Sequence, residues 1–261
     1  MILFTIFACS PPSLSPTEYT LLWQEGFDGP QGQALNEEVW ELRVGGHGWG
    51  NNQLEHNTAR TENVRLSGEG ELEIVALRES FEGNEYTSAR IKTQESFALP
   101  GSRFEARIKL PKGQGLWPAF WLLGSTFEEE GWPLCGEVDI MEFRGESPNE
   151  FLTTVHGPGF SGGGSVGDTH NTEIDLSEDY HTYAVEVDNE YIAWYFDDER
   201  VHAISNGHLA GGDWIFNGDT RIILNLAVGG NFLLPPTENT PFPSTMSVDW
   251  VRYWQRDVIE P

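Results

Sequence analysis

Apolar and polar residues alternate along most of this chain, as they do in β-strands with one buried face. Clusters of glycine, asparagine, aspartate and proline separate the alternating segments. We expect strands at 21–27, 72–76, 104–110, 183–187, 192–196, 222–228 and 246–254. Helical periodicity is confined to short pieces, and no internal repeat is present. Many short strands predict an antiparallel sandwich of two sheets, in which the first and last strands are neighbours.

Two further segments add detail to this pattern. Asp197-Asp198 follows the strand at 192–196 and predicts the turn of a β-hairpin. In segment 116–122, Trp117 and Trp121 share one face of the predicted strand, and leucine and phenylalanine occupy the other. If the leucine face is buried, both tryptophans point away from the core.

Three carboxylates interrupt the apolar run at 136–142. Strand side chains alternate between faces, so Glu137 and Asp139 share one face and Glu142 falls on the other. A β-bulge at Ile140 or Met141 would return Glu142 to the face of the other two acids. Crowded acids lower stability through repulsion and desolvation, so we interpret the cluster as functional.

Two simpler interpretations of this strand remain open. It could be an edge strand with a solvated acidic face, although Val138, Ile140 and Met141 between the acids argue against this. It could also bind a metal ion. The spacing lacks the oxygen-ligand loop of an EF-hand, and an apolar strand is a poor calcium cage.

The chemistry that best matches the cluster is retaining glycoside hydrolysis. That reaction needs two carboxyl groups about 5–5.5 Å apart, one acting as nucleophile and one as acid/base. Glu137 and Glu142 could take these roles, with Asp139 between them. Nearby negative charge should raise the pKa of Glu142, which can then protonate the leaving oxygen. Once Glu137 is esterified, the pKa of Glu142 should fall, and it can accept a proton from water.

The composition limits the partners. The formal net charge is −26, with 41 acidic residues against 15 basic ones. This acidity is spread along the chain and disfavours nucleic acid, anionic membranes and sulfated polysaccharides, which need lysine and arginine. A neutral substrate and a salt-tolerant surface are expected. The chain contains 10 tryptophans, and we expect some of them to stack on a ligand.

The sequence divides into a short leader, a linker, one domain and a tail. Residues 1–9 are apolar and end at Cys9, as in a truncated bacterial lipoprotein signal, and 10–18 form a Ser/Pro linker. We therefore expect an exported, extracellular or cell-envelope protein, attached to a membrane only through a lipid on Cys9. The domain spans 19–256, followed by the tail 257–261.

Several motifs together resemble glycoside hydrolase family 16. Gly136-Glu137-Val138-Asp139-Ile140-Met141-Glu142 is similar to its active-site motif, in the bulged form. The resemblance extends over segments 23–29, 48–52, 86–91, 113–121, 155–159 and 223–230. It is strongest to the laminarinase-like endo-β-1,3-glucanases. The resemblance implies an all-β fold, a β-jelly-roll sandwich of two antiparallel sheets with a concave substrate cleft.

The resemblance also implies a role for individual residues. Glu137 matches the nucleophile, Asp139 its assisting acid and Glu142 the acid/base. The matched substrate contacts are the tryptophans Trp117, Trp121 and Trp132 and the polar residues Asn51, Arg90 and His156. From spacing alone, Arg90 could instead pair with a surface acid, and His156 could be a buried, hydrogen-bonded histidine.

Catalysis in this family needs no cofactor, but many relatives bind a structural Ca²⁺ ion. Gly26, Gly70 and Asp249 match that site, although Gly26 replaces an acid that is usual there. Phe232 stands where tryptophan is common, and Ala89 and Gln53 also depart from the usual residues.

These features predict retaining endo-hydrolysis of laminarin-type β-1,3-glucan by a monomer. Three alternatives remain open on the same fold. Two are hydrolysis of mixed-linkage β-1,3-1,4-glucan and hydrolysis of a galactan such as agar or carrageenan. The third is a non-catalytic β-glucan-binding protein, although such relatives typically lose a catalytic glutamate and this chain retains both.

Overall fold

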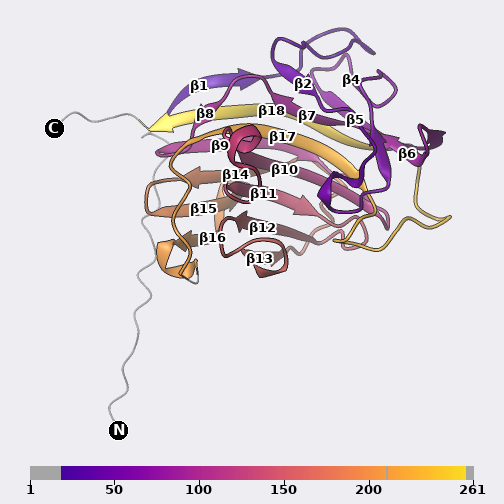
Figure 1. The fold of residues 1–261 in the computed structure, drawn as a ribbon. Helices are drawn as coiled ribbons and strands as arrows, with labels where there is room; N and C mark the ends of the chain where they lie inside the picture. The colour runs from indigo at the N-terminus through magenta and orange to yellow at the C-terminus, as the bar shows by residue number, and fades with distance from the viewer. Residues whose placement is uncertain (1–18, 210, 257–261) are drawn as a thin grey trace, which may run out of the picture.

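The computed structural model describes residues 19–209 and 211–256 (Figure 1). The proposed signal with Cys9, the Ser/Pro linker and the tail lie outside the described residues. No helix within these residues is long and apolar enough to cross a membrane. The helical elements are the short α-helix α1, Phe127–Glu130, and the 3-10 helices η2 Gly48–Gly50, η3 Gly162–Gly164 and η4 Asn206–His208.

The larger sheet contains ten strands. Their bounds are β1 Tyr19–Glu25, β3 Glu55–Asn57, β4 Val64–Leu66, β5 Leu72–Phe81, β6 Asn84–Ser88, β9 Ser102–Lys109, β14 His181–Val187, β15 Tyr191–Phe196, β16 Glu199–Ser205 and β18 Ser244–Arg256. They lie in the order β16-β15-β14-β9-β18-β5-β6-β3, with β1 also paired to β18 and β4 to β5. Pairing is antiparallel except between β3 and β6, among the strands described.

The smaller sheet contains eight strands. Their bounds are β2 Trp40–Leu42, β7 Arg90–Thr93, β8 Phe97–Ala98, β10 Leu116–Gly124, β11 Glu137–Phe143, β12 Glu150–His156, β13 Val166–Asn171 and β17 Asp219–Val228. The order is β13-β12-β11-β10-β17-β7-β2, with β8 also paired to β17. The strand that carries the three acids, β11, therefore lies inside the sheet, and the edge-strand interpretation is wrong.

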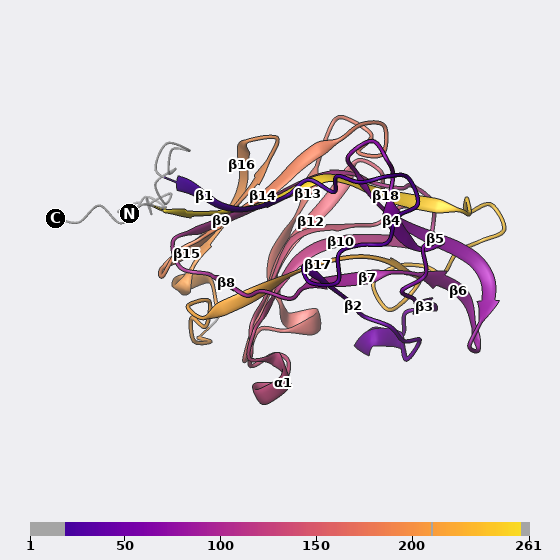
Figure 2. The same ribbon diagram turned by 90° about the horizontal axis from the view of Figure 1, so that it is seen from above.

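The core fills the space between the two sheets. Figure 2 shows the sheets one over the other, with α1 on the side of the eight-stranded sheet that faces away from the larger one. Leu116, Phe120 and Leu122 of β10 are fully buried in this core, as the alternation predicted. The alternate positions of β10, with Trp117 and Trp121, therefore lie on the outer face of the smaller sheet.

All seven predicted strands are present. The structure extends most of them at their ends, and β5 continues to Phe81. The predicted hairpin is also confirmed, because Asp197 and Asp198 connect β15 to β16 with positive φ values of 46° and 66°. The first and last strands, β1 and β18, are paired as expected.

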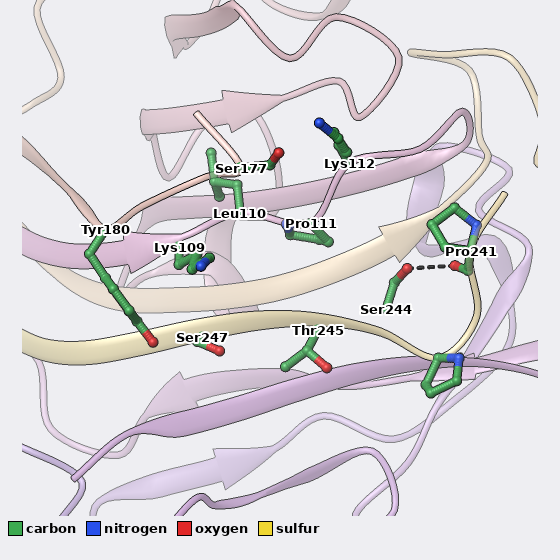
Figure 3. A pocket seen from close by; sticks show the side chains of 11 residues that line it. Lys109, Leu110, Pro111, Lys112, Ser177, Tyr180, Pro241, Ser244, Thr245 and Ser247 are labelled. Carbon is green, nitrogen blue, oxygen red and sulfur yellow. Dashed lines mark hydrogen bonds between the residues drawn. The ribbon is translucent and has the colours of Figure 1, made fainter. Parts of the chain in front are cut away.

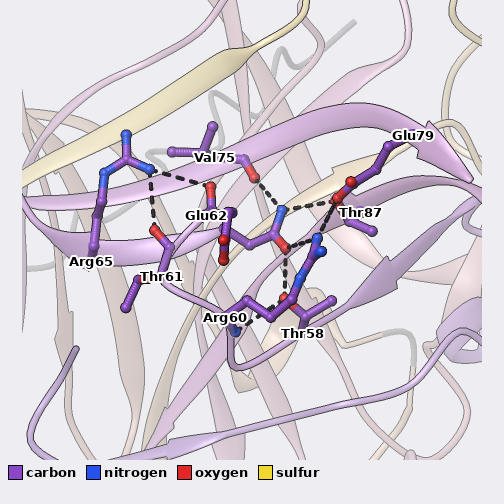
Figure 4. Close-up of polar contacts among 9 residues, drawn as sticks. Thr58, Arg60, Thr61, Glu62, Arg65, Val75, Glu79 and Thr87 are labelled. Carbon is purple, nitrogen blue, oxygen red and sulfur yellow. Dashed lines mark hydrogen bonds and ion pairs between the residues drawn. The ribbon is translucent and has the colours of Figure 1, made fainter. Parts of the chain in front are cut away.

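A polar network holds the segment between β3 and β4 against the larger sheet (Figure 4). Asn63 is fully buried and donates hydrogen bonds to the carbonyl of Val75 at 3.0 Å and to Thr87 at 2.9 Å. Arg60 donates to Asn63 and pairs with Glu79. This network gives the buried side chains of Asn63 and Thr87 hydrogen-bond partners beside β6, which leads directly into β7 and Arg90.

Candidate active site

The predicted β-bulge is present in β11. On its β10 side, Met141 pairs with Phe120 and Asp139 with Trp121, so Ile140 is the extra residue. The same irregularity separates Asp139 from Glu142 on the β12 side. Ile140 and Met141 both enter the core, and Glu142 returns to the outer face with Glu137.

Each of the two glutamates accepts a hydrogen bond from an indole N–H. Trp132 Nε1 donates to Glu137 Oε2 at 3.0 Å, and Trp117 Nε1 donates to Glu142 Oε1 at 3.2 Å. Trp132 is 45% exposed and follows α1, whereas Trp117 is 7% exposed within β10. The two tryptophans therefore hold both carboxyl groups and form part of the surface around them.

His156 lies on β12 directly opposite Glu137. Its Nε2 is 3.2 Å from Asp139 Oδ2 and 3.7 Å from Glu137 Oε1. Asp139 is 3% exposed, and the indole of Trp194 binds its backbone carbonyl from the other sheet at 2.9 Å. The acid trio and His156 are thus brought together as predicted.

The electrostatics of the trio are unusual. Burial raises the pKa of Glu137, Asp139 and Glu142 to about 8 each, and Asp139 adds to the shift of both glutamates through its charge. The charge of Arg90 opposes the shift at Glu137. The three groups therefore cannot all be ionised at neutral pH, and the site retains protons that can be transferred.

Arg90 lies between two indole rings. Its guanidinium carbon is 4.9 Å from the ring centroid of Trp49 and 4.6 Å from that of Trp121. Burial lowers the pKa of Arg90 to about 10, while Glu137 opposes this, so the side chain stays cationic at neutral pH. Trp121 in turn donates a hydrogen bond from Nε1 to Asn225 at 2.8 Å. The alternative of an Arg90 surface ion pair is therefore wrong.

Sequence reasoning missed three residues around Arg90. Trp49 and Asn225 lie in segments 48–52 and 223–230, where the resemblance to the family is the only signal. Glu55 gave no signal at all, yet it is fully buried, and burial raises its pKa to about 8. It accepts a hydrogen bond from the backbone N–H of Val228 at 2.8 Å, which links β3 to β17.

At the Trp117 side of the site, Phe232 packs against the indole at a centroid distance of 4.8 Å. Asn51 is exposed nearby, and its carbonyl accepts a hydrogen bond from the backbone of Asn231 at 2.7 Å. A Cβ at Gly230, whose φ is +104°, would stand 3.0 Å from that carbonyl oxygen. Glycine here permits the close approach that places Asn51 beside Trp117.

A metal ion is an alternative occupant of this cluster. Glu137, Asp139 and His156 offer ligand atoms within 4.8 Å of one another. However, His156 Nδ1 accepts a hydrogen bond from the backbone N–H of Gly162 at 3.2 Å. The neutral ring then carries its proton on Nε2, the nitrogen that would have to bind the ion. The arrangement is better suited to proton transfer than to metal binding.

Comparisons with known proteins agree with this geometry. Residues 49–252 match the family "Glycosyl hydrolases family 16". The chain belongs to this family. It is 37% identical to a beta-glucanase of Rhodothermus marinus, over 91% of this chain and 85% of the relative. It is 36% identical to a glucan endo-1,3-beta-glucosidase of Cryptopygus antarcticus, over 90% of this chain and 92% of that relative.

A solved endo-beta-1,3-glucanase from Pyrococcus furiosus superposes with a TM-score of 0.85. The two share 40% identity, over 92% of this chain and 95% of that one. The predicted β-jelly-roll sandwich is therefore confirmed, and the protein is a glycoside hydrolase of family 16 that resembles the laminarinases.

Two of the residues predicted to hold calcium, Gly26 and Gly70, lie close together, and Asp249 lies on the neighbouring strand β18. Asp249 lies at the position where the pairing of β18 with β9 shifts register. On its other edge, β18 pairs with β1 and β5. A Cβ at Gly70 would lie 3.9 Å from the carbonyl oxygen of Gly26 and 3.7 Å from Asp28 Oδ1. Asp249 also forms a 2.6 Å ion pair with Arg107. These oxygen donors are of the kind that Ca²⁺ prefers.

Figure 3 shows a depression of about 560 Å³ elsewhere, where β9 ends and β18 begins. Two of the three lysines in the chain line it, Lys109 and Lys112, but no carboxylate does. Lys112 is already paired with Asp175 at 2.6 Å. The depression lacks the groups needed for glycoside hydrolysis, whereas the carboxylate cluster of β11 supplies them, so this cluster is the candidate active site.

Proposed function

We propose that this protein is a retaining endo-β-1,3-glucanase that hydrolyses laminarin-type glucans. The observation that carries the proposal is the bulged strand β11, which places Glu137, Asp139 and Glu142 on one outer face between two indole donors. The two named relatives and the solved glucanase support the same substrate class.

In this mechanism Glu137 attacks the anomeric carbon while Glu142 protonates the leaving oxygen. The indole of Trp117 occupies Oε1 of Glu142, so Oε2 carries the proton for the leaving group. Formation of the glycosyl ester removes the negative charge of Glu137. This charge and that of Glu142 repel each other before the ester forms. The pKa of Glu142 then falls, and it accepts a proton from the attacking water.

Substrate binding is assigned to the surface around the trio. Trp132 is exposed next to Glu137 and offers a face for one sugar ring. Trp121 is half-buried on the same sheet face, and Trp117 is buried and holds Glu142. Arg90 and Asn51 supply polar contacts to the sugar hydroxyls beside the acid trio. The surface is acidic overall, and this supports a neutral glucan over a sulfated galactan.

A screen of reducing-end release tests the substrate. Laminarin should be cleaved fastest, mixed-linkage glucan more slowly, and cellulose and agarose poorly. Faster cleavage of agarose or a carrageenan would transfer the assignment to the galactan alternative. Binding of laminarin with no release of sugar would instead support a glucan-binding protein.

The assignment of the nucleophile has its own test. Glu137→Ser should abolish hydrolysis while the melting temperature and laminarin binding stay close to wild type. In the wild-type protein, NMR of the first product should show the β-anomer before mutarotation. Near wild-type turnover by the variant, or an initial α-product, would overturn the double-displacement mechanism.

We also propose a structural Ca²⁺ ion held by the carbonyl oxygens of Gly26 and Gly70 and by Asp249. Binding to the folded state alone would stabilise it by about 2.7 kcal/mol at a concentration 100-fold above Kd. For a domain of this size, each kcal/mol shifts the melting temperature by about 2–4 °C. EDTA should therefore lower the melting temperature and added CaCl₂ should restore it. An Asp249→Asn variant with the same EDTA response as wild type would contradict the site.

A further inference from the structure

His156 uses both of its ring nitrogens within the protein. Nδ1 accepts a hydrogen bond from the backbone N–H of Gly162, and Nε2 faces Asp139 and Glu137. A backbone amide can only donate, so Nδ1 must be unprotonated. A neutral imidazole has a single N–H, and in His156 that N–H is therefore on Nε2. No ring nitrogen is left for a sugar hydroxyl.

The nitrogen donor nearest to an unpaired oxygen of Asp139 is Nε2 of His156. Asp139 is 3% exposed, and its Oδ2 is buried without a hydrogen-bond partner among the described residues. Its distance of 3.2 Å from Nε2 is the shortest contact between His156 and the trio. Leaving a carboxyl oxygen buried and unpaired costs free energy, so a donor at this distance affects the protonation of Asp139.

The segment that fixes the tautomer is itself anchored in the core. Gly157 and Phe160 form an isolated antiparallel bridge just after β12, and Phe160 is 1% exposed. Phe160 packs near Phe216 at a centroid distance of 6.3 Å. The chain then turns through η3, and this turn presents the N–H of Gly162 to the histidine.

We propose that His156 is a positioning residue for the acid pair Asp139–Glu137, and that the backbone of Gly162 sets its tautomer. This rests on the retaining mechanism proposed above. In the reacting enzyme, the unpaired Oδ2 of Asp139 takes up the N–H of His156, which lies 3.2 Å away. The proton that Asp139 shares with Glu137 is then held on the other carboxyl oxygen of Asp139. Asp139 then donates to Glu137, which remains ionised as the nucleophile. His156 acts through Asp139 and does not bind the sugar through its ring nitrogens.

Three variants of His156 separate this role from a substrate contact. Glutamine can place an amide N–H near the position of Nε2, asparagine can reach only the position of Nδ1, and alanine offers neither. We expect H156A and H156N to lower kcat about 10- to 100-fold, the size of a lost hydrogen bond to a charged group, with little change in KM. H156Q should recover part of kcat.

The pH profile gives a second readout. Without the donor, the pKa of the acid pair rises, so the acid limb of kcat/KM should move to higher pH in H156A and H156N and less in H156Q. A raised KM with unchanged kcat would show an ordinary substrate contact. An unmoved acid limb, with H156Q no better than H156A at a similar melting temperature, would show a purely structural role. Either result overturns the proposal.

The tautomer can be measured without activity. In the ¹⁵N-histidine NMR spectrum of the full chain near pH 8, His156 should show an unprotonated Nδ1 and a protonated Nε2, assigned by comparison with H156Q. A protonated Nδ1 would refute the role of Gly162. If laminarin is not hydrolysed at all, the proposed function fails, while the NMR result still decides the tautomer.

Discussion

At the scale of single residues, Glu137 and Glu142 differ mainly in the solvent exposure of the tryptophan that donates to each. Trp132 is 45% exposed and lies beside Glu137, where a sugar can cover it. Trp117 is buried against Phe232 and holds Glu142 from within β10. The indole donor at Glu137 can therefore contact a sugar directly, whereas the donor at Glu142 mainly fixes the carboxyl group.

This difference leads to a prediction for Trp117→Phe. Burial and the charge of Asp139 raise the pKa of Glu142 to about 8, and the indole N–H of Trp117 opposes that rise. Removing the N–H should raise the pKa further. Since the acid must be protonated, activity is lost as pH rises through this pKa, so the basic limb of kcat/KM should move to higher pH.

Trp121→Phe is the matched control for this measurement. It removes an indole N–H from the same face of β10, but that N–H is bonded to Asn225 and not to an acid of the trio. Its basic limb should stay at the wild-type pH even if KM rises. Equal shifts in both variants would mean that loss of aromatic surface, and not the hydrogen bond to Glu142, controls the profile.

The residues that the sequence predicted and those it missed differ in one physical respect. The acid trio lies within six residues, so strand alternation and one bulge were enough to group it. Glu55 meets Val228 across 173 positions of the sequence. Such a contact depends on which strands become neighbours, and local periodicity holds no information on that order. The pairing of Arg90 with Trp49 was missed for the same reason.

At the scale of elements, the order of strands in the sheets decides what alternation alone could not. The apolar residues of β11 predicted a buried strand, and its place between β10 and β12 confirms this. Alternation did not reveal that β13 and β16, the edge strands of different sheets, approach each other. They do so through His170 and His202, whose ring centroids are 5.9 Å apart.

This histidine pair predicts a pH dependence of stability. Burial lowers the pKa of both His170 and His202 below the usual 6.5. The unfolded chain therefore binds protons first, so the stabilisation is present above pH 6.5 and is lost as pH falls below it through the lowered values. The contribution of this pair to the melting temperature should therefore fall as pH is lowered from 7.5 to 5.

The carboxyl groups of the trio change stability in the opposite direction, because their raised pKa values favour the folded state at low pH. A His202→Gln variant isolates the histidine effect from theirs. When pH is lowered from 7.5 to 5, the melting temperature of this variant should rise relative to that of wild type. A difference between the two proteins that stays constant would show that the edge pair does not contribute.

At the scale of the whole molecule, charge is the dominant feature that neither sheet order nor the active site explains. The 41 acidic residues exceed the 15 basic ones, and many of the basic side chains are already paired, such as Arg65 with Glu73 and Arg256 with Asp188. Most acids therefore have no cation of their own. Self-repulsion among them should oppose the compact state at low ionic strength.

Salt should relieve this repulsion. The Debye length shortens from about 30 Å at 0.01 M to about 10 Å at 0.1 M, so charges on opposite sides of the domain stop interacting. We predict that the melting temperature rises from dilute buffer to several tenths molar NaCl, while the rate on neutral laminarin persists. Binding of a polyanion would instead weaken steeply with salt. A melting temperature that falls with NaCl would mean that paired cations or a bound metal already neutralise the acids. Running the series with EDTA present separates these two causes, because only the metal is removed.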